Sequence, residues 1–233
     1  MNRLVFPLAA ALALAAIASP AAAGTVTGKV TYDDKVPSLR PLDMNADPAC
    51  AAKHSSPVTA EVLVLGAGNA LANVFVEVKN PPAGAAPKGR VEIDQNGCMY
   101  KPHVAAVGAG QELLFKNSDG ILHNVHGLPE VNREFNVGMP ATLKEKGQVL
   151  AKAEPMFKVK CDVHPWMNAW VAVVSHPYFC ITGADGKFTI ANLPAGTYQV
   201  EAWHERLGTQ TGSVTVAADG SQTLDFSFKV PAK

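Results

Sequence analysis

The stretch "DGKFTIANLPAGTYQVEAW", residues 185–203, decides which class of fold the chain can adopt. Its second half places Tyr198 and Val200 two residues apart, with polar residues on either side of each. Alternation with a period of two residues is typical of a strand that buries one face. Turn-forming sequences, "GADGK" at 183–187 and "LPAGT" at 193–197, interrupt the apolar pattern. The stretch therefore predicts strands that are joined by tight turns.

Other segments of the chain alternate in the same way. The apolar residues that share one face are Val26 and Val30 in the first segment, Val74, Val76 and Val78 in the second, and Leu224, Phe226 and Phe228 in the third. Long apolar patterns with the 3.6-residue period of a helix are absent from the sequence. We therefore predict an all-β fold.

The stretch at 185–203 also resembles a known family. Its pattern D-G-x-F-x-I-x-x-L-P-x-G-x-Y-x-V is similar to the second half of a carboxypeptidase regulatory-like domain, a small transthyretin-like β-sandwich. The first half of that pattern is matched by "GTVTGKV" at 24–30 and "LANVFVEV" at 71–78. The resemblance implies one sandwich split into residues 24–85 and 179–231. A single larger all-β domain is the alternative.

A second set of strands separates these two halves. The stretch "NPPAGAAPKG", residues 80–89, is rich in Pro, Gly and Ala and reads as a linker or domain boundary. The strand-like segments that follow it are "PHVAAV", "QELLFKN", "HNVHG", "FKVKC" and "AWVAVVS". We predict an inserted domain over residues 90–178.

A possible metal site lies in the stretch "KVKCDVHPWM", residues 158–167, which spaces Cys161, His164 and Met167 three residues apart. Strand alternation puts Cys161 on the core-facing side, and Pro165 then ends the strand and begins a loop. A short loop can bring a thiolate, an imidazole and a thioether together, but it cannot surround a metal ion by itself. A further ligand is therefore expected from elsewhere in the chain.

Upstream, "NSDGILHNVHG" offers that ligand as His123 or His126. In an extended strand, residues three apart face opposite sides, so both histidines cannot reach one centre. We favour His123 because it lies nearer the turn.

Two histidines, one cysteine and one methionine form the ligand set of a blue-copper site. The pattern C-x-x-H-x-x-M with an upstream H-N resembles type I copper proteins, the cupredoxins, and within them the amicyanin group, over roughly residues 91–176. The resemblance implies a Greek-key β-sandwich, with His123, Cys161 and His164 as strong copper ligands and Met167 as the weak axial one. It also implies that Asn124 holds the ligand loop and donates a hydrogen bond near the thiolate. Met139 and Met156 are alternative axial ligands.

The other cysteines are Cys50, Cys98 and Cys180. An exported chain should pair two of the three, and three pairings are possible. We favour Cys50–Cys98 because both flank polar or Gly-rich turns, whereas Cys180 lies between apolar residues. The pair would tie the long N-terminal excursion to the inserted domain.

Residues 1–23 predict where the chain resides. Arg3 precedes an apolar run that ends in the A-x-A pattern of Ala21 and Ala23, which is typical of a secretory signal. We therefore expect a periplasmic or secreted protein that does not span the membrane after cleavage. Lys plus Arg and Asp plus Glu each number 20, a balance that argues against a nucleic-acid partner.

The most specific functional hypothesis is a one-electron carrier with a single copper ion. His164 would lie near the surface as the electron route, and a redox partner protein would dock on an apolar patch around Trp166 and Trp170. One alternative is a copper carrier or delivery protein that does not shuttle electrons. Another is a binding module with a structural metal. We expect no enzyme, because the sequence offers no H-x-H copper cluster, nucleophile with a base, or phosphate loop.

Overall fold

The structure is a computed structural model that describes residues 23–231. The predicted secretory signal at 1–23 therefore lies outside the described residues, apart from Ala23. Within the described range, no helix has the length and apolar character needed to cross a bilayer.

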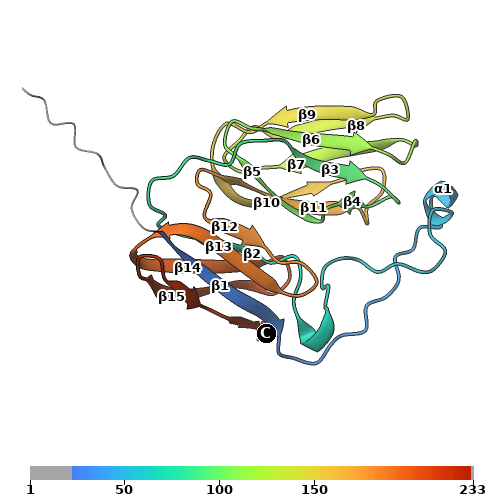
Figure 1. The fold of residues 1–233 in the computed structure, drawn as a ribbon. Coiled ribbons are helices and arrows are strands. Elements are labelled where there is room, and N and C mark those ends of the chain that lie inside the picture. The colour runs from blue at the N-terminus through green and yellow to red at the C-terminus, as the bar shows by residue number, and fades with distance from the viewer. Residues whose placement is uncertain (1–22, 232–233) are drawn as a thin grey trace, which may run out of the picture.

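Strands dominate the chain, as the alternation predicted (Figure 1). The strands are β1 (Ala23–Tyr32), β2 (Phe75–Val78), β3 (Val91–Gln95), β4 (Tyr100–Lys101), β5 (Val104–Gly108), β6 (Glu112–Asn117), β7 (His123–Leu128), β8 (Phe135–Met139), β9 (Glu145–Val149), β10 (Glu154–Lys160), β11 (Asn168–Val174), β12 (Phe179–Ile181), β13 (Lys187–Pro194), β14 (Gly196–His204), β15 (Gly208–Val216), β16 (Ser221–Thr223) and β17 (Phe226–Phe228). The helical segments are α1 (Pro48–Ala51) and the 3-10 turn η1 (Ala67–Asn69). The fold is all-β.

The N-terminal and C-terminal strands form the first sandwich. One of its sheets has the order β13-β1-β16 with β17 also paired to β1, and the other has the order β12-β2-β14-β15. Their facing sides enclose a core to which both predicted alternating sets contribute, such as Val26 and Val30 from β1 and Tyr198 and Val200 from β14. Sequences from both ends of the chain therefore bury one common core.

The strands between them form the second sandwich. Its sheets have the orders β5-β11-β10-β7-β8 and β4-β3-β6-β9. The core between them includes Phe115 from β6, Val125 from β7 and Val159 from β10. β8 and β9 were not among the segments expected from the sequence, because their alternating positions are largely exposed or half-buried.

The two sandwiches pack face to face, so the sheets form a four-layer stack (Figure 1). In β2, Val76 points into the core of the first sandwich. Phe75 is buried instead in a separate apolar cluster that lies between the sandwiches. The sequence predicted one buried face for this strand. Both faces are buried because the sheet of β11 covers the outer side of the sheet of β2.

Polar groups also fix this interface. Glu205 pairs with His103 through one carboxylate oxygen and accepts a hydrogen bond from Trp170 Nε1 at 2.9 Å through the other. Trp170 packs against Trp203 with ring centroids 5.2 Å apart. His103 and Trp170 come from the second sandwich and Glu205 and Trp203 from the first, so the contacts join the two.

The second sandwich enters the first between two neighbouring strands. β2 and β12 are antiparallel partners, with Glu77 opposite Phe179 and a hydrogen bond from Val78 N to Tyr178 O at 3.0 Å. Residues 79–178 therefore leave and return at adjacent points of one sheet.

Residues 41–59, which we call the strap, leave the first sandwich and lie beside the second (Figure 1). A bridge between Pro41 and Thr59 closes the base of the strap, and α1 lies between its two arms. The sequence assigned this segment to the first sandwich, yet its Met44 and Cys50 belong to the core of the second. The cause is a disulfide between Cys50 and Cys98, the pair favoured from the sequence.

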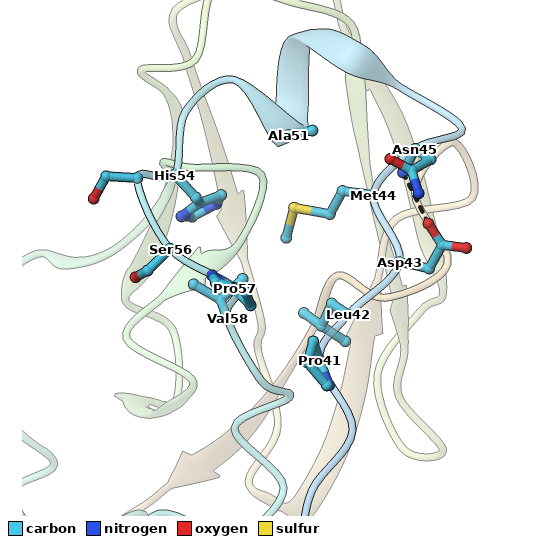
Figure 2. Close-up of a pocket in the computed structure, with 11 residues that line it drawn as sticks. Pro41, Leu42, Asp43, Met44, Asn45, Ala51, His54, Ser56, Pro57 and Val58 are labelled. Carbon is cyan, nitrogen blue, oxygen red and sulfur yellow. Dashed lines mark hydrogen bonds between the residues drawn. The ribbon is translucent and has the colours of Figure 1, made fainter.

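The arms of the strap border an open pocket of about 510 Å³ (Figure 2). Met44 and His54 face each other across it, and the residues that line it come from the strap itself. His54 also bonds through Nε2 to the Gly97 carbonyl at 2.7 Å. This bond and the disulfide anchor the strap to the second sandwich.

Candidate metal centre

Cys161 follows the last residue of β10 and faces the core. The burial of this segment alternates as predicted, with Phe157, Val159 and Cys161 buried while Lys158 is exposed. The next residues form a compact loop in which Met167 N bonds to His164 O at 2.9 Å and Cys161 N bonds to Met167 O at 3.1 Å. The loop thus returns to its starting point within seven residues, and β11 begins directly after it.

His123 begins β7, directly after the turn that contains Asp119. Its side chain is fully buried. His126 faces the other side of the strand, where it bonds to Glu134 and Asp162, each at 2.9 Å. The strand geometry therefore separates the two histidines as predicted and brings His123 alone to the loop.

Three potential ligand atoms converge where β7 meets this loop. One ring nitrogen each of His123 and His164 and the Sγ of Cys161 all lie within 4.8 Å of one another, and all three residues are buried. The Nδ1 atoms of the two histidines are 2.9 Å apart, and Cys161 Sγ lies 3.8 Å from His164 Nδ1. These are the three residues expected to be the strong ligands.

Met167, the expected axial ligand, is fully buried in the same core cluster as Cys161. Met139 is also buried, and it lies opposite His123 in the pairing of β7 with β8. Gln95 Nε2 donates a hydrogen bond to the sulfur of Met139 at 3.0 Å, so this thioether already has a partner. Met156 lies instead beside the cluster between the sandwiches.

Asn124 joins the strand of one histidine to the ligand loop. Its Oδ1 accepts hydrogen bonds from Asp162 N at 2.6 Å and from Val163 N at 3.4 Å. Its backbone N–H points to Cys161 Sγ at 3.5 Å, and Nδ2 donates to Asp162 Oδ2 at 3.0 Å. These contacts fasten the loop to β7 and place a backbone donor near the sulfur.

The surroundings of Cys161 and His123 shift the pKa of both side chains. Burial alone would raise the pKa of the Cys161 thiol, but hydrogen bonding to His123 and to the Asn124 backbone outweighs burial and lowers it. Burial likewise acts to lower the pKa of His123, yet bonds to Asp119 and Cys161 raise it. The cysteine and the histidine therefore stabilise each other in their charged forms, as expected for adjacent groups of opposite charge.

Two carboxylates at the site were not predicted. Asp119 Oδ2 lies 3.0 Å from His123 Nε2, and Asp47 Oδ2 lies 3.0 Å from His164 Nε2. Two sequence signals could have pointed to them. Asp119 precedes His123 by four residues in the "NSDG" turn, and Asp47 precedes Pro48 and Cys50 in the helix-starting pattern "DPAC".

Two expectations about the surface are wrong. His164 is only 2% exposed, because the strap and Asp47 cover its outer edge. Trp170 does not flank the site, since it packs against Trp203 between the sandwiches. Trp166 does lie next to the site, with its ring centroid 5.1 Å from that of His164.

The donor set suits copper better than zinc. Two imidazoles and a cysteine sulfur, with a thioether in the same loop, are soft sulfur and nitrogen donors of the kind that copper accepts. The short separation of the two Nδ1 atoms also requires a positive charge or a proton between them, since two lone pairs at 2.9 Å repel each other. A cation bound by all three residues fits this requirement.

Comparisons with known proteins give partial matches of two kinds, to a family model and to solved structures. The family model of the carboxypeptidase regulatory-like domain matches residues 164–229, a range that includes β11 of the second sandwich as well as the C-terminal strands of the first. No curated protein matches the chain.

Among solved structures, the purple cupredoxin of Nitrosopumilus maritimus has 21% identity and a TM-score of 0.31, over 36% of this chain and 99% of its own. A variant of amicyanin in its Cu(I) form has 20% identity and a TM-score of 0.32, over 42% of this chain and 98% of its own. The copper-containing nitrite reductase (NirK) of Thermus scotoductus SA-01 has 16% identity and a TM-score of 0.34, over 42% of this chain and 25% of its own. The chain is thus similar to a carboxypeptidase regulatory-like domain over residues 164–229 and, over a part of its length, to cupredoxins.

Proposed function

We propose that the protein is an exported type I copper protein that carries one electron. His123, Cys161 and His164 would be the strong ligands and Met167 the axial ligand. The observation that carries the proposal is the convergence of two buried imidazole nitrogens and one buried sulfur within 4.8 Å of one another. That donor set, with a methionine closing the same loop, is the one that a blue-copper centre uses.

When bound, copper would supply exchange of one electron between Cu(I) and Cu(II). The protein's own residues would keep the centre nearly unchanged during this exchange. Asn124 fastens the ligand loop to β7, and the bond from Cys161 N to Met167 O closes that loop. A centre that is held in one geometry reorganises little, which favours fast electron transfer.

The main alternative is a copper carrier or delivery protein without electron shuttling, and a binding module with a structural metal is another. Delivery requires a ligand that a receiving protein can reach. Both histidines and Cys161 are buried, and His164 is additionally covered by Asp47. This burial favours retention of the metal over its transfer.

A redox partner protein is proposed to dock near Trp166. The indole is half-buried, it lies against His164, and its Nε1 donates to the Cys98 carbonyl at 3.1 Å. Val163, in the same ligand loop, is 45% exposed and adds apolar surface. The indole would replace the imidazole edge as the group nearest the partner.

A periplasmic or secreted location is part of the proposal and rests on residues 1–23.

A visible spectrum of the purified chain after addition of Cu(II) tests the proposal. An intense thiolate-to-copper band is expected, and Cys161→Ser should abolish it. His126→Gln is the matched control, because His126 is three residues from His123 but faces outward, and it should keep the band. A chain that stays colourless in Cu(II) would contradict the type I assignment.

The two copper hypotheses are separated by the behaviour of the bound metal. A carrier should give a reversible one-electron wave in voltammetry and retain copper against a competing chelator for hours. A delivery protein should lose the metal within minutes.

Met167→Leu should preserve the colour and raise the reduction potential, since it removes a weak donor to the oxidised metal. Loss of all copper in this variant would contradict a weak axial role.

A further inference from the structure

The outer nitrogens of both imidazoles contact carboxylates. His123 Nε2 faces Asp119 Oδ2 and His164 Nε2 faces Asp47 Oδ2, both at 3.0 Å. An ionised carboxylate only accepts hydrogen bonds, so each Nε2 must carry the proton. With Nε2 protonated, each Nδ1 can face the shared centre as a lone-pair donor to a bound cation, and without a cation one proton lies between the two Nδ1 atoms.

Asp119 is held firmly at the position from which it contacts His123. Its oxygens accept backbone N–H bonds from Gly97 and Cys98, each at 2.7 Å, and Lys53 Nζ lies 3.2 Å away. The carboxylate is almost fully buried and has no freedom to turn away from the ring. It therefore fixes the orientation of His123.

Asp47 reaches His164 from the strap. Its Oδ1 caps α1 by accepting the Ala49 N–H at 2.9 Å, while its Oδ2 contacts the imidazole. Because one carboxylate performs both tasks, the helical turn and the ring are fixed relative to each other. The side chain is 33% exposed, so it also lies between the histidine and solvent.

The Cys50–Cys98 disulfide links the two segments that hold these carboxylates. Cys98 donates its backbone N–H to Asp119, and Cys50 lies in the helical turn that Asp47 caps. The sulfurs themselves lie close to the site. Sγ of Cys50 is within 4.8 Å of a ligand atom of His164, and Sγ of Cys98 is within 4.8 Å of one of His123.

We infer that Asp47 and Asp119, linked through the Cys50–Cys98 disulfide, form a clamp that positions both copper-binding imidazoles with Nδ1 inward. The inference rests on the proposed function for the identity of the metal, but not for the orientation of the rings. It assigns Asp47, which is 117 residues from His164 in sequence, as a positioning residue of the centre. The clamp consists of hydrogen bonds and a disulfide of the chain itself, so it lowers the cost of ordering the ligands.

The experiment uses the full chain and two variants of Asp47. Asp47→Ser keeps a good helix cap but its hydroxyl is too short to contact His164. Asp47→Asn keeps the shape and an acceptor oxygen but removes the charge. Asp43→Asn is the matched control, because Asp43 also lies in the strap and bonds only locally, to Asn45 N at 3.1 Å. Asp119→Asn tests the other arm of the clamp.

The first measurement needs no copper. Nitrogen-15 NMR of the metal-free protein should show His164 as the Nε2–H tautomer in the wild type, in Asp47→Asn and in Asp43→Asn. Asp47→Ser should convert it to a mixture of tautomers. An unchanged tautomer in Asp47→Ser would overturn the inference, because Asp47 would then be only a helix cap.

The second measurement is the reduction potential of the copper form. Asp47→Asn and Asp119→Asn should each weaken Cu(II) relative to Cu(I) about tenfold, which raises the potential by about 59 mV. Asp43→Asn should leave it unchanged. If the tautomer shifts in Asp47→Ser but the wild type binds no copper, the clamp stands and the proposed function fails. If copper binds and the potential and tautomer are the same in every variant, the clamp fails and the proposed function stands.

Discussion

His123 and His164 hold their Nδ1 atoms 2.9 Å apart in the interior of the protein, 41 residues apart in sequence. Both rings are buried, so water cannot solvate the facing nitrogens. Such a pair is stable only with a proton or a cation between the rings, and the sulfur of Cys161, 3.8 Å from His164 Nδ1, is a further donor to a cation. The empty and loaded proteins should therefore differ in stability.

Copper should stabilise the fold by mass action. At a free Cu(II) concentration 100-fold above Kd, the free energy of unfolding should rise by about 2.7 kcal/mol, because the ligands converge only in the folded chain. Thermal unfolding with and without copper measures the difference. Cys161→Ser should lose the effect and His126→Gln should keep it. An equal gain in the Cys161→Ser variant would place the stabilising metal elsewhere.

Asn124→Ala should destabilise the protein by about 1–3 kcal/mol, because it leaves the N–H groups of Asp162 and Val163 without their acceptor. Denaturant unfolding measures this loss, and the thiolate-to-copper band should shift because the loop is no longer fixed to β7. Asn136→Ala is the control, since Asn136 is a more exposed partner of Asp162. Equal losses in the two variants would show that Asn124 has no special role.

Breaking the Cys50–Cys98 disulfide should cost about 4 kcal/mol in the chain-entropy model, given a sequence separation of 48 residues. A Cys50→Ser/Cys98→Ser variant should also release the strap and expose His164. Limited proteolysis should then cut within residues 41–59, and a chelator should remove copper faster than from the wild type. Protection of the strap equal to that in the wild type would mean that His54 and Asp47 hold it without the disulfide.

Stability should fall on acidification because of His204. Burial lowers the pKa of this histidine to about 4, and its Nδ1 accepts the Arg206 N–H. In the unfolded chain the pKa is about 6.5, so the folded state binds the proton less well. The contribution of neutral, buried His204 to the free energy of unfolding is complete above about pH 6.5 and declines as the pH falls. It is lost near pH 4, and the total loss is roughly 3 kcal/mol.

Unfolding of the metal-free protein between pH 4 and 7 measures this dependence. His204→Gln should flatten the acid side of the stability curve, whereas His54→Gln, which retains His204, should not. A curve of unchanged slope in the His204→Gln variant would assign the acid sensitivity to other groups.

The sequence predicted the fold class well because alternation reports directly on burial. It failed where burial depends on contacts between domains. Phe75 and Trp170 look like outward-facing residues of their strands, yet both are covered when the sandwiches stack. Edge strands such as β9 were missed because they bury little apolar surface and so leave little pattern.

The candidate site was predicted in part for a similar reason. Cys161, His164 and Met167 share one loop, and the turn before His123 marks where a strand begins, so local patterns identified them. Asp47 approaches from the strap, and its distance from His164 depends on a disulfide and a helical turn. No local spacing encodes that contact, although the favoured pairing of Cys50 with Cys98 indicated that the strap is tied to the second sandwich.

The neighbouring positions of β2 and β12 have a consequence for the order of folding. About 100 residues separate Val78 from Phe179, and closing so long a flexible loop costs about 4 kcal/mol. If residues 79–178 fold first, their two ends lie side by side. The entropy of loop closure is then already lost before β2 pairs with β12. The first sandwich should therefore be the late-forming part of the molecule, and its folding rate should depend on the integrity of the second.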